Sequence, residues 1–262
     1  MAGNRYSQLI EKIFFDNYKK GSKRVEFLRT DIEKAAKKLK FTLPKNLGDV
    51  IYSFRFRTEL PSKILALARN DEEWLIKLAG RSIYCFSLEP KLEIIPNPNL
   101  AHSKILDSTP GVISKYSLTD EQALLAILRY NRLIDIFLGI TCYSLQNHLR
   151  TTVPNLGQVE TDEVYIGIDK KGVHYVIPVQ AKGGTDKQGK VQIEQDLELC
   201  ANKFSNLICI PVAAQFMPDG KIALFSFERD DSAIKITSER HYELVSNEDL
   251  SDEELIKYQK RK

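Results

Sequence analysis

The chain has few cysteines and no long apolar segment. Its cysteines are Cys85, Cys142, Cys200 and Cys209, and no two of them form a Cys-x-x-Cys pair. This spacing argues against a structural zinc site and a disulfide framework, so we expect four reduced thiols. The longest apolar stretches, such as residues 133–140, contain charge and are too short to span a bilayer. The polar N-terminus has no signal-peptide core. We therefore expect a soluble, cytoplasmic protein with no membrane partner.

Histidine is equally scarce, and its spacing matches no metal-binding pattern. The chain has 4 histidines in 262 residues, and only His148 lies near the candidate site described below. An apolar content of 43% is ordinary for a globular protein and excludes the disordered classes. The length is sufficient for one large domain or two small ones.

Charge is unevenly distributed along the chain. Residues 1–89 hold 18 Lys plus Arg against 11 Asp plus Glu, a balance of +7, whereas residues 90–262 hold 20 against 24. A basic segment favours polyanion binding, because each phosphate contact releases counterions. A merely solvated basic face would have the same composition, so the charge alone does not decide between them.

The N-terminal third has the pattern of three helices followed by a hairpin. Apolar residues recur at helical spacing in 5–18, 31–39 and 45–57, and two short apolar runs, 74–78 and 83–88, follow. This order resembles a winged helix-turn-helix module, in which one helix enters the major groove of DNA. On that resemblance the third helix presents Lys45, Asn46, Asp49, Ser53, Arg55 and Arg57 to double-stranded DNA. The alternative is a helical dimerisation cap.

A proline-containing connector and a strong helix follow. Residues 90–116 contain four prolines and little periodicity, which predicts a link between domains. Ser117 or Thr119 can cap a helix that extends to about Gly139. Its Glu121 is a candidate metal ligand. The next segment alternates apolar and polar residues as a strand, in which His148 and Arg150 share one face as candidate DNA contacts.

The most informative segment is a predicted hairpin. Two apolar runs, Val164 to Ile168 and Tyr175 to Val179, are separated by a turn that ends at Gly172. Side chains of residues two apart in sequence lie on the same face of a strand. Glu160 and Asp162 therefore share one face, and Gln180 and Lys182 also share one face. We expect these four side chains to converge, so that oxygen ligands for a hard cation lie beside the Lys182 ammonium group. The alternative is an amphipathic hairpin whose charged ends are solvated.

These residues resemble the PD-(D/E)xK nuclease superfamily. Asp162, an apolar strand, and a paired strand that ends in Gln180-Ala181-Lys182 match its motif, over an α-β-β-β-α-β pattern in residues 118–228. Two features depart from the motif: Val153-Pro154 is not joined to the aspartate, and Gln180 replaces the usual Asp or Glu. The resemblance implies Mg²⁺ bound by Asp162, by the Gln180 side chain and by the Ala181 backbone carbonyl. Lys182 would act on the phosphate, and Glu160 could restore the missing charge.

The chain also resembles bacterial type II restriction endonuclease-like proteins through residues 130–135, 144–150, 176–182 and 192–196. Gln192 opens the next helix and is a further candidate DNA contact. We therefore predict an α/β (α+β mixed) protein with a winged helix-turn-helix-like reading domain in 1–89, a connector in 90–116 and a restriction-endonuclease-like catalytic core in 117–262.

The predicted function is that of a Mg²⁺-dependent DNA endonuclease, active as a homodimer on double-stranded DNA. Two alternatives remain open. One is a structure-specific repair nuclease or junction resolvase of the same fold. The other is a DNA-binding regulator whose nuclease-like domain is inactive, which the glutamine at position 180 favours.

Overall fold

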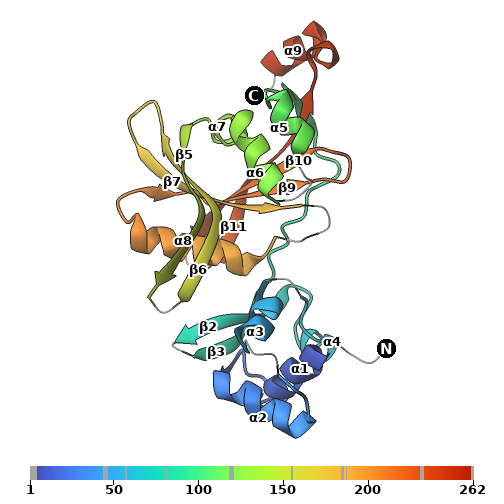
Figure 1. Cartoon of the computed structure of the whole chain (residues 1–262), viewed down its shortest axis with the longest axis vertical. Helices are drawn as coiled ribbons and strands as arrows, with labels where there is room; N and C mark the ends of the chain where they lie inside the picture. Colours follow the sequence, from blue (N-terminus) through green and yellow to red (C-terminus); the bar gives the residue numbers. More distant parts are fainter. Residues whose placement is uncertain are drawn as a thin grey trace. The chain divides into compact units, whose positions relative to one another are not determined.

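The protein is mixed α/β and divides into two compact units (Figure 1). The computed structural model describes residues 5–43, 47–56, 58–80, 82–117, 121–154, 156–183, 186, 188–230 and 233–260. The first unit comprises residues 1–93, 151–159 and 189–195, and the second comprises 94–150, 160–188 and 196–262. Among the described residues, none of the helices is long and apolar enough to cross a bilayer.

The N-terminal unit combines four helices with a small antiparallel sheet. Its elements are α1 (Arg5–Asn17), β1 (Arg24–Leu28), α2 (Arg29–Leu39), α3 (Leu47–Phe56), α4 (Ser62–Leu65), β2 (Glu72–Gly80) and β3 (Ile83–Pro90). The sheet has the order β1-β3-β2. Its core contains Phe14, Trp74 and Phe86, and the Phe14 ring meets the other two edge to face. The three predicted helices and the hairpin are therefore present, whereas β1 and α4 were not predicted.

The second unit is built on an eight-stranded mixed sheet, although residues 151–159 of β5 and β6 and residues 189–195 at the start of α8 are grouped with the first unit. Its elements are β4 (His102–Leu106), α5 (Gly111–Tyr116), α6 (Glu121–Tyr130), α7 (Leu133–Leu138), β5 (Thr141–Val153), β6 (Gly157–Ile168), β7 (His174–Lys182), α8 (Lys190–Lys203), β8 (Ile208–Cys209), β9 (Val212–Phe216), β10 (Ile222–Asp230), β11 (Ala233–Val245), a 3-10 turn η1 (Asn247–Asp249) and α9 (Asp252–Gln259). The strand order is β4-β11-β10-β9-β7-β6-β5, and β8 pairs with β7.

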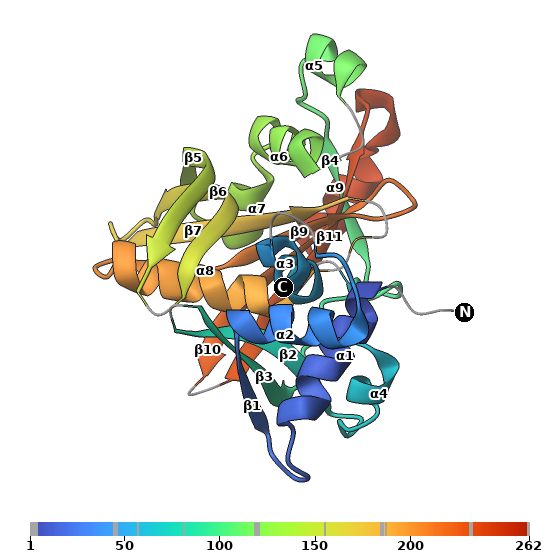
Figure 2. The ribbon, with the colours of Figure 1, turned by 60° about the horizontal axis from the view of Figure 1, so that its bottom comes forward.

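Helices cover both faces of this sheet (Figures 1 and 2). On one face, α6 and α7 bury a leucine-rich stripe against β7, β9 and β10, with Leu124 and Leu128 fully buried. On the other face lies α8. Residues 90–116, predicted as a connector, supply β4 and α5, and β4 pairs with β11 in parallel. The order α6, α7, β5, β6, β7, α8, β9 contains the predicted α-β-β-β-α-β succession.

The predicted hairpin is confirmed. β6 and β7 pair antiparallel, from Ile168↔His174 to Glu163↔Val179. The turn between them is held by the Asp169 carboxylate, which accepts hydrogen bonds from the backbone N–H groups of Lys171 and Val173. Gly172 has a φ of 79°, in the left-handed region that glycine adopts without strain.

The single helix predicted to end near Gly139 is instead two helices. The break falls at Arg132, which has a φ of 50° and therefore cannot continue an α-helix. Asn131 accompanies the break, because its side chain accepts from the Ser108 N–H and donates to the Thr109 hydroxyl. Neither residue is a glycine or a proline, so the usual break signals are missing at this position. Thr119, one of the two predicted caps, lies outside the described residues.

Candidate functional site

The candidate site lies at the end of β7 and beside the middle of β6, next to the first residue of α6. At this end of the hairpin the Ala181 N–H donates to Asp162 Oδ2 at 2.8 Å. The adjacent Lys182 places its Nζ 2.6 Å from Glu121 Oε1. Three predicted site residues, on three different elements, are thereby brought to one location: Asp162, Lys182 and Glu121.

Asp162 is a partly exposed carboxyl group in a charged environment. Burial raises its pKa, whereas the Ala181 N–H and the Lys182 ammonium lower it. Glu121 raises the pKa further and His148 lowers it, so both groups are close enough to interact with Asp162. The carboxyl group therefore has one acidic neighbour, Glu121, and two basic neighbours, Lys182 and His148. Such clusters of interacting ionisable groups are common at functional sites.

Gln180 makes contacts that the sequence did not predict. Its side-chain nitrogen donates to both oxygens of Asp196, at 3.2 and 3.0 Å, and Gln180 is 1% exposed. Asp196 also accepts from the Thr161 hydroxyl. The Gln180 side chain, whose carbonyl oxygen was expected to bind the metal, is thus engaged through its amide nitrogen in a buried hydrogen-bond cluster on the α8 side of the sheet.

Asp196 is the main functional candidate that sequence reasoning missed. It is 1% exposed, and burial raises its pKa to about 7, although the hydrogen bonds from Thr161 and Gln180 act in the opposite direction. The charge on Asp162 adds to the increase. One signal was available: Asp196 follows Gln192 by four residues, which places the two on the same face of a helix.

Glu160 forms a separate group with residues of β5. Arg150 Nη2 lies 2.8 Å from Glu160 Oε2, and His148 Nδ1 lies 3.2 Å from Glu160 Oε1. The other ring nitrogen of His148 contacts Gln122 Nε2 of α6 at 3.2 Å, a partner that was not predicted. His148 has a φ of 49°, an uncommon conformation for a residue other than glycine. These contacts join β5 and β6 to the N-terminal turn of α6.

The predicted DNA contacts of the N-terminal unit divide into two sets. Lys45, Asn46 and Arg57 lie outside the described residues. In α3, Ser53 hydrogen bonds with the Thr58 hydroxyl, and the Arg55 guanidinium lies 4.8 Å from the ring centre of Phe56. Burial lowers the pKa of Arg55, so this side chain braces the unit instead of projecting into solvent.

Gln192 lies in the first turn of α8, within the residues that belong to the N-terminal unit. Its neighbours Lys190 and Glu194 form an ion-pair network with β2 and β3. Lys190 contacts Glu89 at 3.0 Å, and Lys77 contacts Glu194 at 2.6 Å. This network anchors the start of α8 to the small sheet.

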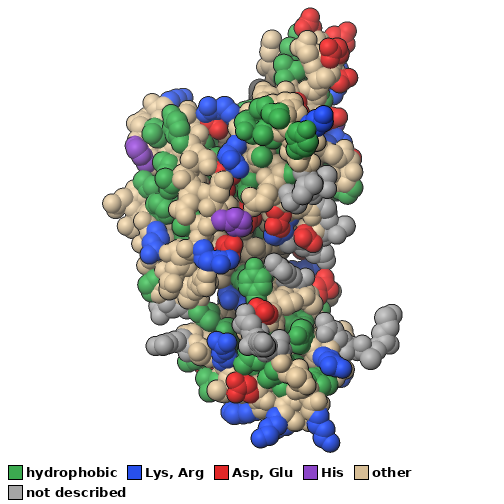
Figure 3. All heavy atoms as spheres, in the orientation of Figure 1, with side chains coloured by type: hydrophobic (Ala, Val, Ile, Leu, Met, Phe, Trp, Pro, Cys, Tyr) green, Lys and Arg blue, Asp and Glu red, His purple; other side chains and the backbone are tan. Residues whose placement is uncertain are grey.

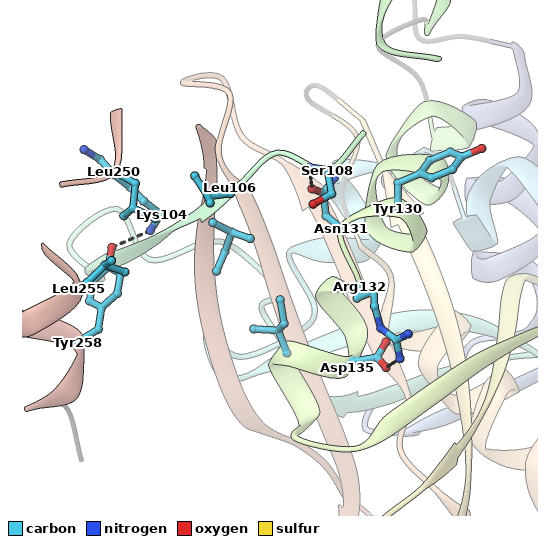
Figure 4. Close-up of a pocket in the computed structure, with 12 residues that line it drawn as sticks. Lys104, Leu106, Ser108, Tyr130, Asn131, Arg132, Asp135, Leu250, Leu255 and Tyr258 are labelled. Atoms are coloured by element: carbon cyan, nitrogen blue, oxygen red, sulfur yellow. Dashed lines mark hydrogen bonds and ion pairs between the residues drawn. The ribbon is translucent and has the colours of Figure 1, made fainter. Parts of the chain in front are cut away.

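A pocket of ≈ 540 Å³ in the second unit is separate from these residues (Figure 4). Tyr130, at the end of α6, lines it, whereas Glu121 begins that helix, roughly 13 to 14 Å away along the axis. Polar groups in the pocket pair with one another: Arg132 with Asp135, and the Lys104 N–H with the Tyr258 hydroxyl. The lining offers apolar surface and internally paired charges, so we do not assign the chemistry to it.

Within the described part of the chain, no three His, Cys, Asp or Glu side chains are grouped so that they could hold a metal ion by themselves. Comparison with protein-family models, with curated proteins and with solved structures finds no match to the chain.

Proposed function

We propose that the protein is a Mg²⁺-dependent DNA endonuclease of the PD-(D/E)xK type. The observation that carries the proposal is the meeting of Asp162, Lys182 and Glu121 at the end of the β6–β7 hairpin. Two acidic groups beside an ammonium group, on two interior strands of a mixed sheet and the first residue of a helix, form a suitable arrangement for phosphodiester hydrolysis. The α-β-β-β-α-β succession of the second unit supports the same family.

The donor set fits Mg²⁺. This ion is bound in proteins by one or two carboxylates and completes its shell with water and substrate phosphate, so a cage of three acidic side chains is not required. Asp162 and the Ala181 carbonyl would hold it, and Glu121 is the second carboxylate within reach of Lys182. When bound, the ion would activate a water molecule and offset charge on the phosphate.

The chain's own residues have separate roles in this proposal. The Ala181 N–H fixes the orientation of the Asp162 carboxylate. The Lys182 side chain is 13% exposed, and its ammonium forms an ion pair with Glu121. A phosphate of the substrate would compete with Glu121 for this ammonium. Lys182 then stabilises the negative charge that develops on the scissile phosphate. Glu160, paired with Arg150 and His148, keeps these two basic groups at the rim, where they can contact the DNA backbone.

We assign the recognition of double-stranded DNA to the N-terminal unit. On the face shown in Figure 3, Lys and Arg side chains gather at the end of this unit, over α2. Lys34, Lys37 and Lys38 of α2 are exposed. Helices α1, α2 and α3, followed by the short α4 and the β2–β3 hairpin, have an order similar to that of a winged helix-turn-helix. A homodimer, in which each copy cuts one strand, stays a prediction.

Cleavage of a mixed-sequence plasmid in the presence of Mg²⁺ tests the proposal. Wild-type protein should produce discrete fragments, and Lys182→Ala should abolish cutting while DNA affinity changes only a few-fold, because Lys182 acts on the transition state. Lys170→Ala, in the exposed β6–β7 turn, is the matched control and should cut normally. Diffuse or junction-only cutting would instead indicate a repair nuclease or a resolvase. Wild-type rates in Lys182→Ala would contradict the assigned site.

One observation favours a second candidate, a DNA-binding regulator without nuclease activity. The family places a carboxylate where this chain has Gln180, and the Gln180 amide is engaged by Asp196. A protein that binds DNA in gel-shift assays with the salt dependence of phosphate contacts, yet never cuts it with Mg²⁺ or Mn²⁺, would support this candidate.

A further inference from the structure

A buried carboxylate that the proposed nuclease site does not use lies between α6 and β5. Glu163 of β6 is 0% exposed and accepts a hydrogen bond from the Ser144 hydroxyl of β5 through its Oε1 atom. Arg129 of α6 places its Nε atom 3.1 Å from the same oxygen. Three different elements therefore meet at one ion pair whose acidic member is buried.

Arg129 is fixed on one side only. Its Nε atom is buried, yet 35% of its side chain is exposed. Among the described residues, neither terminal Nη atom of Arg129 has a hydrogen-bond partner, and neither is buried. A guanidinium group that is held through Nε and open at its two Nη atoms can donate two parallel hydrogen bonds to a phosphate.

Glu163 and Arg129 depend on each other. Burial raises the pKa of Glu163, whereas the hydrogen bond from Ser144 and the charge of Arg129 lower it. If Arg129 moved away, a buried carboxylate would lose its compensating charge, which is unfavourable. Arg129 is therefore held in position before a ligand arrives, and little side-chain entropy is lost on binding.

The ion pair lies on the side of α6 that faces β5. Gln122 of α6 contacts His148 of β5 at 3.2 Å, and Arg129 follows Gln122 by about two helical turns. Both residues therefore face the same strand. From Glu121, at the candidate site, the helix rises about 12 Å to Arg129. Each strand of DNA advances roughly 3.4 Å per nucleotide along the axis, so this rise corresponds to about three or four nucleotides.

We propose that Arg129, oriented by Glu163 and Ser144, is a second phosphate-binding site, which contacts the DNA backbone a few nucleotides from the phosphate at Asp162 and Lys182. A contact of this kind fixes the position of the strand and does not read its sequence. The site rests on the proposed function in one respect: the protein must bind DNA, although it need not cut it.

Gel-shift titration of the full-length protein with a mixed-sequence DNA duplex in EDTA tests the proposal, because binding is then measured without cleavage. The double variant Arg129→Gln with Glu163→Gln keeps the net charge and leaves no buried charge unpaired. It should bind more weakly. The slope of the logarithm of the binding constant against the logarithm of the salt concentration should become shallower by roughly one unit, for one lost phosphate contact.

The matched control is Arg229→Gln with Glu198→Gln. This change removes an ion pair of 2.7 Å between α8 and β10, whose members are both partly exposed, and it also keeps the net charge. It should bind DNA with the affinity and the slope of wild type. A smaller slope in both double variants would overturn the proposal, because the effect would not depend on the position of the ion pair.

Arg129→Lys provides a second test and is the deciding variant if thermal unfolding shows that the first double variant is not folded. Lysine keeps the charge but lacks the two parallel donors, so binding should weaken while the slope stays near that of wild type. An arginine that only braced the fold would predict unchanged binding in every folded variant, and that result would overturn the proposal.

The outcomes separate this site from the proposed nuclease activity. If the Arg129 variants bind as wild type does and Lys182→Ala abolishes cutting, the nuclease function stands and the second phosphate site is wrong. If the double variant loses one unit of slope in a protein that never cuts DNA, the phosphate site stands and the nuclease function is wrong. Absence of DNA binding by wild type would overturn both.

Discussion

The side-chain nitrogen of Gln180 donates hydrogen bonds to both carboxylate oxygens of Asp196, which is 1% exposed. This contact explains how a glutamine can occupy a position where the nuclease motif has an acid. An acidic residue at 180 would lie against a buried carboxyl group, whereas an amide satisfies it. Gln180 and Asp196 must therefore be considered together.

The first prediction is that Gln180→Glu destabilises the protein, although sequence alone suggests that it restores the motif. Two carboxylates would share a buried site, and an uncompensated buried charge costs roughly 3 to 5 kcal/mol. Urea unfolding at pH 8 should show this decrease in the free energy of unfolding. The double variant Gln180→Glu with Asp196→Asn exchanges donor and acceptor and should recover most of it. An unchanged free energy of unfolding in Gln180→Glu would contradict the contact.

The second prediction concerns pH. The pKa of Asp196 is raised from 3.8 to about 7 in the folded protein. Between these values the unfolded chain releases a proton that the folded chain keeps, so the free energy of unfolding falls as pH rises from about 4 to about 7. The fall is on the order of 4 kcal/mol. In Asp196→Asn this component should vanish, so the profile of unfolding free energy against pH should be flatter than that of wild type. Parallel profiles would contradict it.

The part of this site that could be predicted depends on interactions between residues close together in the sequence. The β6–β7 hairpin depends on a turn only a few residues long, in which Asp169 and Gly172 have types suited to their conformations. The hairpin alone positions Asp162 beside Ala181. The position of Lys182, which follows Ala181 in β7, was predictable for the same reason.

The parts that could not be predicted depend on interactions between distant segments. Asp196 meets Gln180 only because α8 packs across the strands, and nothing in the spacing of 16 residues requires that hydrogen bond. Likewise, the break at Arg132 is accompanied by hydrogen bonds of Asn131 with Ser108 and Thr109, from a segment whose prolines predict a connector. β1 had a signal in the sequence, since charged Arg24 and Glu26 alternate with apolar Val25 and Phe27, but a strand of five residues between two helices is easily missed.

The third prediction tests packing of the hairpin. A Cβ added at Gly167 would lie 2.9 Å from Ile177 Cδ1 and 3.0 Å from Ile140 Cγ2, in the core between β6 and the helices. Gly167→Ala should therefore destabilise the protein by about 1 to 3 kcal/mol. Gly111→Ala is the control: it meets no heavy atom within 4 Å and lies at the start of α5, so it should be neutral or slightly stabilising. Thermal unfolding of both variants measures the difference, and equal effects would contradict the packing described for Gly167.

The last prediction concerns DNA reading by the N-terminal unit. One way to test this is to delete the N-terminal unit and compare DNA binding. A fragment that begins near residue 112 is unsuitable, because it also lacks β4, which pairs with β11 in the large sheet. Substitution of exposed lysines avoids this difficulty. Lys37→Gln with Lys40→Gln removes two charges at the end of α2, whereas Lys170→Gln with Lys171→Gln removes two from the exposed β6–β7 turn.

If α2 faces the phosphate backbone, the first double variant should bind DNA more weakly. The slope of the logarithm of the binding constant against the logarithm of the salt concentration should also become shallower by roughly two units, one for each phosphate that a lysine no longer neutralises. The second should keep the wild-type slope, because both variants change the net charge equally and only the position differs. Gel-shift titrations at several salt concentrations measure both slopes. Equal slopes in the two variants would mean that binding follows overall charge, and would favour the helical dimerisation cap over the winged helix-turn-helix for residues 1–89.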